Sequence, residues 1–303
     1  MSKIRTLSKI LKNDPKKIIK ILGGKGFFNW MPDKLYLKIV YWGETGKKLN
    51  LEDPKTYNEK LQWIKLYDRK QEYSTYVDKY EVRKYIAKTI GEEYLIPIIG
   101  VYELPNQFVL KCTHGSGSNI ICHDKNKLDI NNAKKKLNKW MKKNWYWFGR
   151  EWPYKNVKPR IICEKYISEG TEIPDDYKIM CFNGEPKCIQ LHKGRFTNHL
   201  QDFYTTDWKL MKLNQGLPST NGLQERPSKL DEMLDLSRTL SKGFKHIRVD
   251  FYYVNKKLYF GELTFFDGSG FYPFEPEEYD YLLGGWINLK ENEIINRSTG
   301  EQR

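Results

Sequence analysis

The alternation of polar and apolar side chains over residues 246–270 predicts a β-hairpin. Two runs rich in β-branched and aromatic residues, IRVDFYYV and LYFGELTF, flank a polar connection of three residues, 255–257. With a loop of that length, residue 250 lies opposite residue 262, and residue 248 lies opposite residue 264. Side chains alternate between the faces of a strand, so we expect one face to be apolar core and the other to be polar. The polar side chains are Arg248, Asp250, Glu262 and Thr264.

Asp250 and Glu262 are therefore expected to be cross-strand neighbours, about 5 Å apart. Like charges at that distance destabilise a sheet unless a positive charge neutralises them. A divalent ion would do so, and Mg²⁺ is commonly held by one or two carboxylates together with substrate phosphates. Arg248 would also do so if it paired with both acids on a solvated face of the sheet. The pattern leaves both interpretations open.

Apolar positions at helical spacing predict helices elsewhere in the chain. A Trp/Tyr-rich stretch precedes the second of these helices, and the last has Ser228 and Asp231 as an expected capping box. The predicted helical segments are 1–22 (split by Pro15), 53–69, 78–91, 131–143 and 228–243.

A strand, a turn of small residues and a second strand are predicted over QFVLKCTHGSGSNIIC, residues 107–122. Glycines and serines in such a turn let backbone N–H groups approach phosphate oxygens, and Lys111 at the end of the first strand adds a positive charge. The spacing differs from the Walker A motif, which places Gly-Lys-Ser/Thr before a helix. By themselves these residues favour a plain hairpin turn over a phosphate-binding loop.

Residues 160–167 are expected to form a buried strand that leads into a polar connection, SEGTEIPDD, which we interpret as a hinge. The following segment predicts a second hairpin that turns at Asn183-Gly184, a dipeptide favoured in tight hairpin turns. Its charged residues include Asp176, Lys178, Lys193 and Arg195.

Six aromatic residues crowd the segment NWYWFGREWPYKN, residues 144–156. Aromatic faces beside Lys and Arg stack on bases or on the apolar faces of sugars. The alternative is that these rings fill the protein core.

The chain has 303 residues and a net charge of +14, which favours polyanionic partners such as nucleotides, nucleic acid, acidic glycans or an anionic membrane surface. Five cysteines without CxxC spacing indicate reduced core residues of a cytoplasmic protein and no disulfide framework or zinc site. No run of 18 or more apolar residues is present, so no membrane span is expected. The basic amphipathic segment 1–22 either lies on anionic lipid at the inner face of the membrane or docks onto the protein itself.

The order of these segments resembles the ATP-grasp superfamily over residues 70–275. More narrowly, NEKLQWIKLYD, DKYEVRKYI, FVLKCTHGSGSN, DYKIMCFNGEPK and the RVDFYY…GELTF ending resemble the TupA-like ATP-grasp family, which is associated with bacterial surface polysaccharides. The resemblance implies an α+β fold in which two α+β lobes hold the nucleotide between them, with a helical N-terminal extension. The implied domains are residues 1–70, 71–165 and 166–290, followed by a polar tail, 291–303.

The resemblance also implies ATP and Mg²⁺ as cofactors and assigns roles to the candidate residues. Lys111 and Lys178 would hold phosphates beneath a flap that consists of Thr113, Gly115, Ser116, Gly117 and Ser118. The adenine edge would meet Glu164 and the backbone of Lys165 and Tyr166. Asp250 and Glu262 would bind Mg²⁺, and Thr264 stands where the superfamily usually has Asn. Arg248 and Arg195 would stabilise the transferred phosphoryl group.

The implied reaction is ATP-dependent ligation of a carboxylate and an amine or amino acid through an acyl phosphate. In this family the carboxylate would belong to a uronic acid or another anionic sugar or glycan of the capsule or cell surface. A phosphotransferase of the same fold would use the same ATP residues. A glycosyltransferase would need a nucleotide-sugar motif, and the chain has neither G-x-G-x-x-G nor D-x-D. A nucleic-acid-binding module would explain the charge but would leave the paired carboxylates unexplained, so no nucleic-acid partner is expected.

Overall fold

The computed structural model describes residues 19, 22–23, 26–99, 104–168, 174–195 and 197–290. The chain divides into two compact units, one of residues 1–50 and 62–174 and one of residues 51–61 and 175–303. The functional domains expected from the sequence remain predictions. The predicted helices over residues 1–18 and the predicted polar tail lie outside the described residues.

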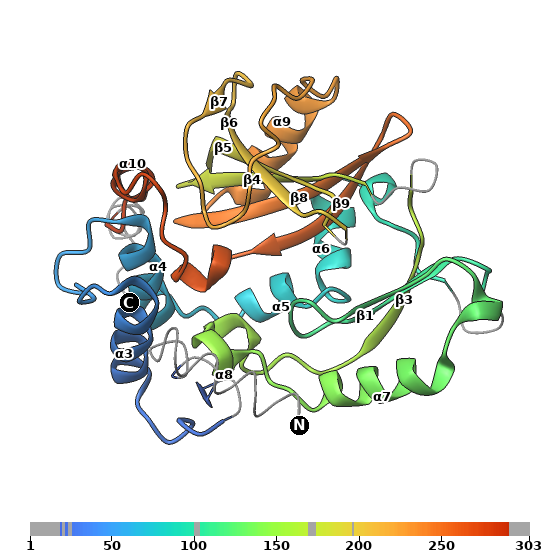
Figure 1. The fold of residues 1–303 in the computed structure, drawn as a ribbon, viewed down its shortest axis with the longest axis horizontal. Coiled ribbons are helices and arrows are strands. Elements are labelled where there is room, and N and C mark those ends of the chain that lie inside the picture. Colours follow the sequence, from blue (N-terminus) through green and yellow to red (C-terminus); the bar gives the residue numbers. More distant parts are fainter. Residues whose placement is uncertain are drawn as a thin grey trace, which may run out of the picture. The chain divides into compact units, whose positions relative to one another are not determined.

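The first unit contains an antiparallel three-stranded sheet in the order β2-β1-β3 (Figure 1). The predicted strand, turn and strand over 107–122 are confirmed, and the turn connects β1 to β2. Helix α7 packs on β1 and corresponds to the predicted helix 131–143. The strands are β1 (Phe108–Cys112), β2 (Asn119–Cys122) and β3 (Ile161–Lys165). The helices are α3 (Asp33–Thr45), α5 (Tyr73–Val77), α6 (Val82–Thr89), α7 (Ile130–Met141) and α8 (Tyr146–Gly149), with 3-10 turns η1 (Glu92–Tyr94), η2 (Lys125–Lys127) and η3 (Trp152–Tyr154).

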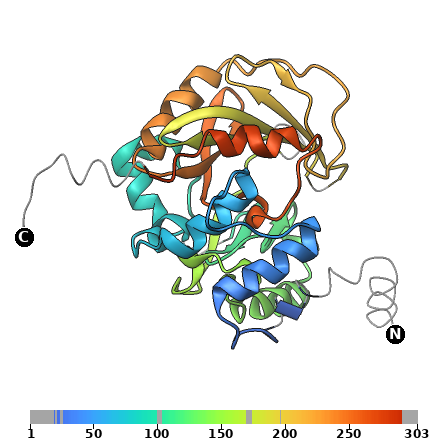
Figure 2. The same cartoon turned by 90° about the vertical axis from the view of Figure 1, so that its left-hand side faces the viewer.

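The second unit is built on an antiparallel six-stranded sheet in the order β7-β6-β5-β4-β8-β9. Helix α9 packs on β4, β5 and β8 (Figure 2), and the Cys181 thiol of β4 lies 3.9 Å from the Ser237 carbonyl of α9. The strands are β4 (Asp176–Phe182), β5 (Glu185–Lys193), β6 (Leu200–Thr205), β7 (Leu210–Met211), β8 (His246–Val254) and β9 (Lys257–Thr264). The helices are α9 (Leu230–Ser241) and α10 (Glu278–Gly285), with the 3-10 turn η4 (Asp267–Gly270), and α4 (Tyr57–Tyr67) begins in this unit and ends in the first.

Alternation along the strands gives this sheet one apolar and one polar face. Ile179, Ile189, Val249 and Leu263 are almost completely buried on the face that meets α9. Burial of this apolar surface stabilises the unit, by roughly 25 cal/mol per Å². The opposite face of the sheet carries the charged residues of β4, β8 and β9.

The predicted hairpin over 246–270 forms, but with a shorter turn than expected. Val254 pairs with Lys257, so the turn has two residues, and both have positive φ, as in a type I′ turn. A β-bulge between Asp250 and Phe251 adds one residue on β9 and restores the expected pairs, 250 with 262 and 248 with 264. The extra residue is Gly261, where a Cβ would lie only 3.1 Å from the Asp250 carbonyl oxygen.

The second predicted hairpin is also present, with Asn183 and Gly184 at positive φ in its turn. The predicted capping box at the start of α9 is wrong. Lys229 is the N-cap residue and has no side-chain cap, because the Ser228 hydroxyl pairs with the Tyr253 hydroxyl at 2.8 Å.

The five cysteines are free, and four of them are buried. Burial raises the pKa of the Cys181 thiol to about 12 and also raises the pKa of Cys188. Among the described residues, no helix combines the length and apolar character that would let it cross a bilayer.

Segment 51–61 packs against α10 through close backbone contact within the second unit. The Lys60 ammonium donates to the carbonyls of Gly284 and Ile287 at 2.8 and 2.7 Å. A Cβ on Gly284 would lie 2.6 Å from the Thr56 carbonyl carbon, whereas one on Gly285 would meet nothing within 4 Å.

We therefore expect opposite outcomes at two adjacent glycines. Gly284→Ala should destabilise the protein by about 1–3 kcal/mol or more, because the methyl group overlaps fixed backbone. Gly285→Ala should be neutral or stabilise by up to about 1 kcal/mol, because alanine favours the helix. Urea unfolding of both variants measures the difference, and equal stabilities would contradict the described contact.

His246 lies in the core of the second unit between Tyr57 and the backbone of Phe265. Its Nδ1–H donates to the Phe265 carbonyl at 3.1 Å, so Nε2 accepts from the Tyr57 hydroxyl, also at 3.1 Å. Burial lowers the pKa of His246 from 6.5 to about 4. The folded protein therefore holds this imidazole neutral.

We expect this histidine to make stability depend on pH. A depressed histidine pKa means that the unfolded state takes up a proton first, so its contribution is lost as pH falls from 6.5 to about 4. The loss should be about 3 kcal/mol. Unfolding free energies measured across this range should fall less for His246→Asn than for the parent protein; parallel curves would refute this origin.

Candidate functional site

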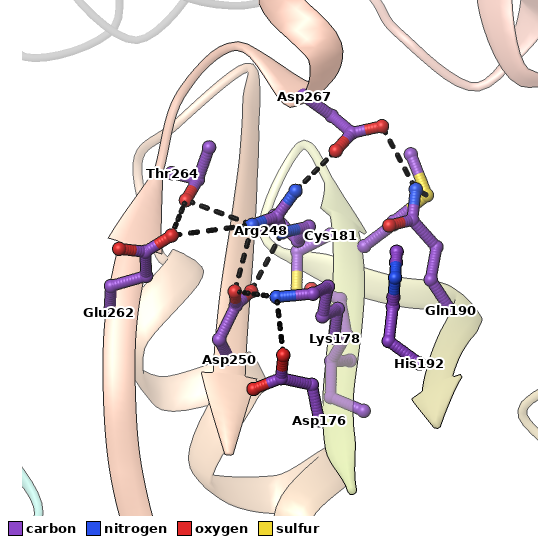
Figure 3. Close-up of polar contacts among 12 residues, drawn as sticks. Asp176, Lys178, Cys181, Gln190, His192, Arg248, Asp250, Glu262, Thr264 and Asp267 are labelled. Atoms are coloured by element: carbon purple, nitrogen blue, oxygen red, sulfur yellow. Dashed lines mark hydrogen bonds and ion pairs between the residues drawn. The ribbon is translucent and has the colours of Figure 1, made fainter. Parts of the chain in front are cut away.

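Arg248 is the centre of a charged cluster on the polar face of the six-stranded sheet (Figure 3). Its Nε and Nη2 donate to the two oxygens of Asp250 at 2.7 and 2.8 Å, and its Nη1 donates to Asp267. Glu262 lies farther away, with its Oε1 3.5 Å from Nη2. Burial alone would lower the pKa of Arg248, but the carboxylates of Asp250 and Asp267 raise it well above its ordinary value.

The expected grouping of Arg248, Asp250, Glu262 and Thr264 on one face is confirmed. The Thr264 hydroxyl accepts from Arg248 at 3.3 Å and donates to Glu262 at 3.2 Å. Arg248 therefore contacts both acids, as the ion-pair interpretation of the sequence expects. The expectation of a solvated face is wrong, because Arg248 and Asp250 are buried.

Lys178 joins the same cluster from β4, where it pairs in register with Asp250 of β8. Its Nζ lies 2.5 Å from Asp250 Oδ2 and 3.7 Å from Asp176 Oδ2. Arg195 contacts the same Asp176 oxygen at 2.8 Å. Burial would lower the pKa of Arg195, but Asp176 raises it. Thus Lys178, Arg195 and Arg248, the three cations predicted to contact phosphate in this unit, each form an ion pair with Asp176 or Asp250 on the polar face of the sheet.

Two residues of the cluster were not predicted from the sequence. Asp267 is 5% exposed, and its second oxygen accepts a hydrogen bond from Gln190 Nε2 at 2.9 Å. Burial would raise the pKa of Asp267, but Arg248 lowers it. Gln190 pairs with Lys178 only because a bulge between Met180 and Cys181 shifts the β4–β5 register. A regular hairpin on Asn183-Gly184 would place residue 189 there instead.

A second polar group lies beside Lys178 on β5 and β6. Gln201 Nε2 donates to His192 Nε2 at 3.2 Å, so His192 Nδ1–H donates to His199 Nε2 at 2.8 Å. Burial, with Lys178 and Arg248 nearby, lowers the pKa of His192 to about 2. His192 is therefore neutral and adds hydrogen-bonding groups without charge.

Asp250 and Glu262 have the chemistry of a magnesium site. Among the described residues, no three His, Cys, Asp or Glu side chains are arranged to share a metal ion. Two facing carboxylates fit Mg²⁺, which takes its remaining ligands from water or phosphate. The Glu262 side chain is 29% exposed and can be reached, whereas Asp250 is 3% exposed and already pairs with Lys178 and Arg248.

In the first unit, Lys111 and Glu164 form an ion pair of 2.6 Å across β1 and β3. The Lys165 N–H, predicted to face adenine, donates to the Pro97 carbonyl at 2.9 Å. An adenine contact through that N–H would have to replace this hydrogen bond.

The predicted flap, residues 113–118, is tied down at both ends within the first unit. The Thr113 N–H donates to the Arg160 carbonyl at 3.0 Å, and the Ser118 carbonyl accepts from the Cys112 N–H at 3.3 Å. Only Ser116 and Gly117 are exposed. The loop lines a pocket of about 140 Å³ together with Trp140, Lys143 and Trp145. Any flap movement is therefore expected to centre on Ser116 and Gly117.

Two of the six aromatic rings in segment 144–156, Tyr146 and Tyr154, are buried in the first unit. Arg150 is 1% exposed and lies over the rings of Tyr36 and Trp147, at 4.4 and 4.6 Å from their centroids. The Tyr146 hydroxyl donates to Asp33 at 2.6 Å. Trp145 is the ring of this segment that lines the pocket beneath the loop. Core filling therefore accounts for Tyr146 and Tyr154, whereas the other four rings are partly buried.

We expect Asp250→Asn and Glu262→Gln to differ in stability although both remove one negative charge. Asp250→Asn should cost about 3–5 kcal/mol, because it weakens the pairing of two buried cations. Glu262→Gln should cost about 1 kcal/mol or less, because this more exposed acid contacts Arg248 at 3.5 Å. Thermal and urea unfolding without ligand measure both, and a fully stable Asp250→Asn variant would argue against the ion pairs.

No curated protein matches the chain. Solved structures with similarity include the D-alanine–D-alanine ligase of Bacillus anthracis complexed with ATP, at 16% identity and TM-score 0.43, over 75% of this chain and 69% of that chain. The D-alanine–D-alanine ligase of Helicobacter pylori gives 12% identity and TM-score 0.45, over 77% and 69%. A family model described as TupA-like ATP-grasp matches residues 59–288, so the chain belongs to the TupA-like ATP-grasp family and has its α+β fold, as the sequence predicted.

Proposed function

We propose that the protein is an ATP-dependent carboxylate–amine ligase that forms an amide through an acyl phosphate. The observation that carries this proposal is the cluster of Lys178 and Arg248 against Asp250 and Glu262 on one sheet face. Buried cations beside paired carboxylates suit the transfer of a phosphoryl group, which depends on positioning and charge neutralisation. Membership of the ATP-grasp family supports ATP as the nucleotide.

The reaction has two steps that balance without a redox partner. An oxygen of the substrate carboxylate attacks the γ-phosphorus of ATP, the bond to the bridging oxygen breaks, and ADP leaves. The amine nitrogen then attacks the acyl carbon, phosphate leaves with the electron pair of the C–O bond, and the nitrogen loses a proton. We propose a uronic acid or a related anionic sugar of a bacterial surface polysaccharide as the carboxylate substrate.

Lys178 and Arg248 would exchange partners when the nucleotide binds. In the described arrangement Asp250 holds both cations, at 2.5 and 2.7 Å. Phosphate oxygens would offer each cation a new anionic partner, and Arg195 would add charge from the rim, where its side chain is 36% exposed. In the first unit, Lys111 would make the same exchange from Glu164 to phosphate.

Asp250 and Glu262 would hold Mg²⁺, and the Thr264 hydroxyl would orient Glu262 through its 3.2 Å hydrogen bond. When bound, Mg²⁺ would neutralise part of the phosphate charge. The release of Asp250 from Lys178 and Arg248 would provide the carboxylate oxygens that the ion needs.

We expect the intact protein to release ADP from Mg-ATP only when a suitable carboxylate is present, and to form an amide when an amine is added. A panel of uronic acids combined with amines and amino acids, with products weighed by mass spectrometry, tests this. A stable phosphoester that persists when amines are added would indicate a phosphotransferase instead.

Lys178→Ala should weaken Mg-ATP binding by at least about tenfold, because one buried charged contact to phosphate is lost. Lys187→Ala is the matched control, since Lys187 is exposed on the neighbouring strand β5. Unchanged affinity in folded Lys178→Ala and Lys111→Ala variants would remove the assignment of both lysines.

A further inference from the structure

A surface of the first unit exposes large apolar side chains among lysines. The surface comprises the turn before α3 and one face of that helix, and we name it the α3 surface. Its apolar members are Phe27, Trp30, Leu35 and Trp42, which are 63%, 76%, 47% and 47% exposed. Its basic members are the exposed Lys34 and Lys38 of α3, and the exposed Lys47 and Lys48 follow directly after the helix.

The exposure of tryptophan rings is concentrated here. The chain has nine tryptophans, and the other seven are at least partly buried. Elsewhere in the described chain, exposed large apolar residues stand singly or in pairs, as at Leu210 and Leu223 and at the adjacent Tyr281 and Leu282 of α10. Grouped exposed apolar side chains on a soluble protein mark a surface that binds something.

The rings are presented from a fixed backbone. The buried Arg150 side chain donates to the Phe28 carbonyl at 2.6 Å, and the Trp30 indole donates to the Phe27 carbonyl at 3.1 Å. Within α3, Tyr36, Leu37, Val40 and Tyr41 are buried in the first unit. Leu35, Lys38 and Trp42 lie at spacings of three and four, so they share the opposite, outward side. The protein therefore anchors one side of α3 and exposes the other.

Charge is concentrated in the sequence that leads into this surface. Residues 1–50 contain twelve Lys and Arg against three Asp and Glu, which gives +9 of the total +14; residues 26–50 contribute four of these lysines, together with Asp33 and Glu44. Basic side chains beside exposed Trp, Phe and Leu fit a binding partner that has anionic groups on its outside and an apolar interior. Nucleic acid would use the lysines and rings but would leave Leu35 without a role.

We propose that the α3 surface docks the protein on an anionic lipid bilayer. Trp30 and Trp42 enter the headgroup region, where indole rings partition favourably, and Leu35 and Phe27 reach the acyl boundary. Lys34 and Lys38 keep their ammonium groups among the lipid phosphates while their stems cover apolar surface. This proposal does not depend on the ligase reaction.

The test is sedimentation of the full chain with vesicles of equal parts phosphatidylglycerol and phosphatidylcholine, and with phosphatidylcholine alone. Trp30→Ser combined with Trp42→Ser should weaken binding to the anionic vesicles by at least about tenfold. Leu223→Ser combined with Tyr281→Ser is the matched control, because these side chains are 82% and 53% exposed in the second unit. Lys34→Gln combined with Lys38→Gln should weaken binding and flatten its salt dependence.

Several results would overturn the proposal. The first is that the unchanged protein does not bind the anionic vesicles. The second is that it binds vesicles of phosphatidylcholine alone equally well, and the third is that the double tryptophan variant binds the anionic vesicles as tightly as the unchanged protein. Loss of binding only when residues 1–18 are removed would assign the contact to that segment, and tight binding to a DNA duplex with none to vesicles would assign it to nucleic acid. Thermal melts check the fold of each variant, and Trp30→Ser alone serves if the double variant unfolds.

Discussion

The ion pair between Arg248 and Asp250 determines how the polar face of the six-stranded sheet is arranged. A guanidinium that is 7% exposed needs anionic partners, and it finds them in Asp250, Asp267 and Glu262. Those acids in turn hold Lys178 and Gln190. The apolar opposite face packs on α9 and fixes the strands, so the charges stay in register. In the proposed function, this face would exchange its internal counter-charges for those of the ligand.

Alternation and turn chemistry predicted both hairpins of this sheet and the pairing of Asp250 with Glu262. The predicted loop length was one residue too long, but the predicted pairing of Asp250 with Glu262 is correct because Gly261 forms a bulge. The sequence held a signal for the bulge, since Phe260 and Leu263 are both apolar although regular alternation would put them on opposite faces. The bulge beside Met180 has no comparable signal, so Gln190 was missed. Asp267 was missed because it follows the strand in a turn, where alternation no longer applies.

In the first unit, local sequence patterns predicted the helices and strands but did not predict the contacts between residues distant in the sequence. The strand, turn and strand over 107–122 and the helices over 78–91 and 131–143 appear where expected. The ion pair of Lys111 with Glu164 joins positions 53 residues apart and depends on the pairing of β1 with β3. The burial of Arg150 among aromatic rings likewise depends on packing between segments distant in sequence. The charge of an arginine would by itself predict an exposed side chain.

Each unit contains free cysteines whose alkylation can report on the opening of its sheet. Cys181 and Cys188 lie within the six-stranded sheet, and their raised pKa values keep them as unreactive thiols while the sheet is closed. Cys112, Cys122 and Cys163 belong to the three-stranded sheet of the other unit, and Cys163 is partly exposed. Alkylation needs an accessible thiolate, so labelling of the four buried cysteines requires their sheets to open. Peptide mapping after brief alkylation would therefore resolve the opening of the two sheets separately in the unmodified chain.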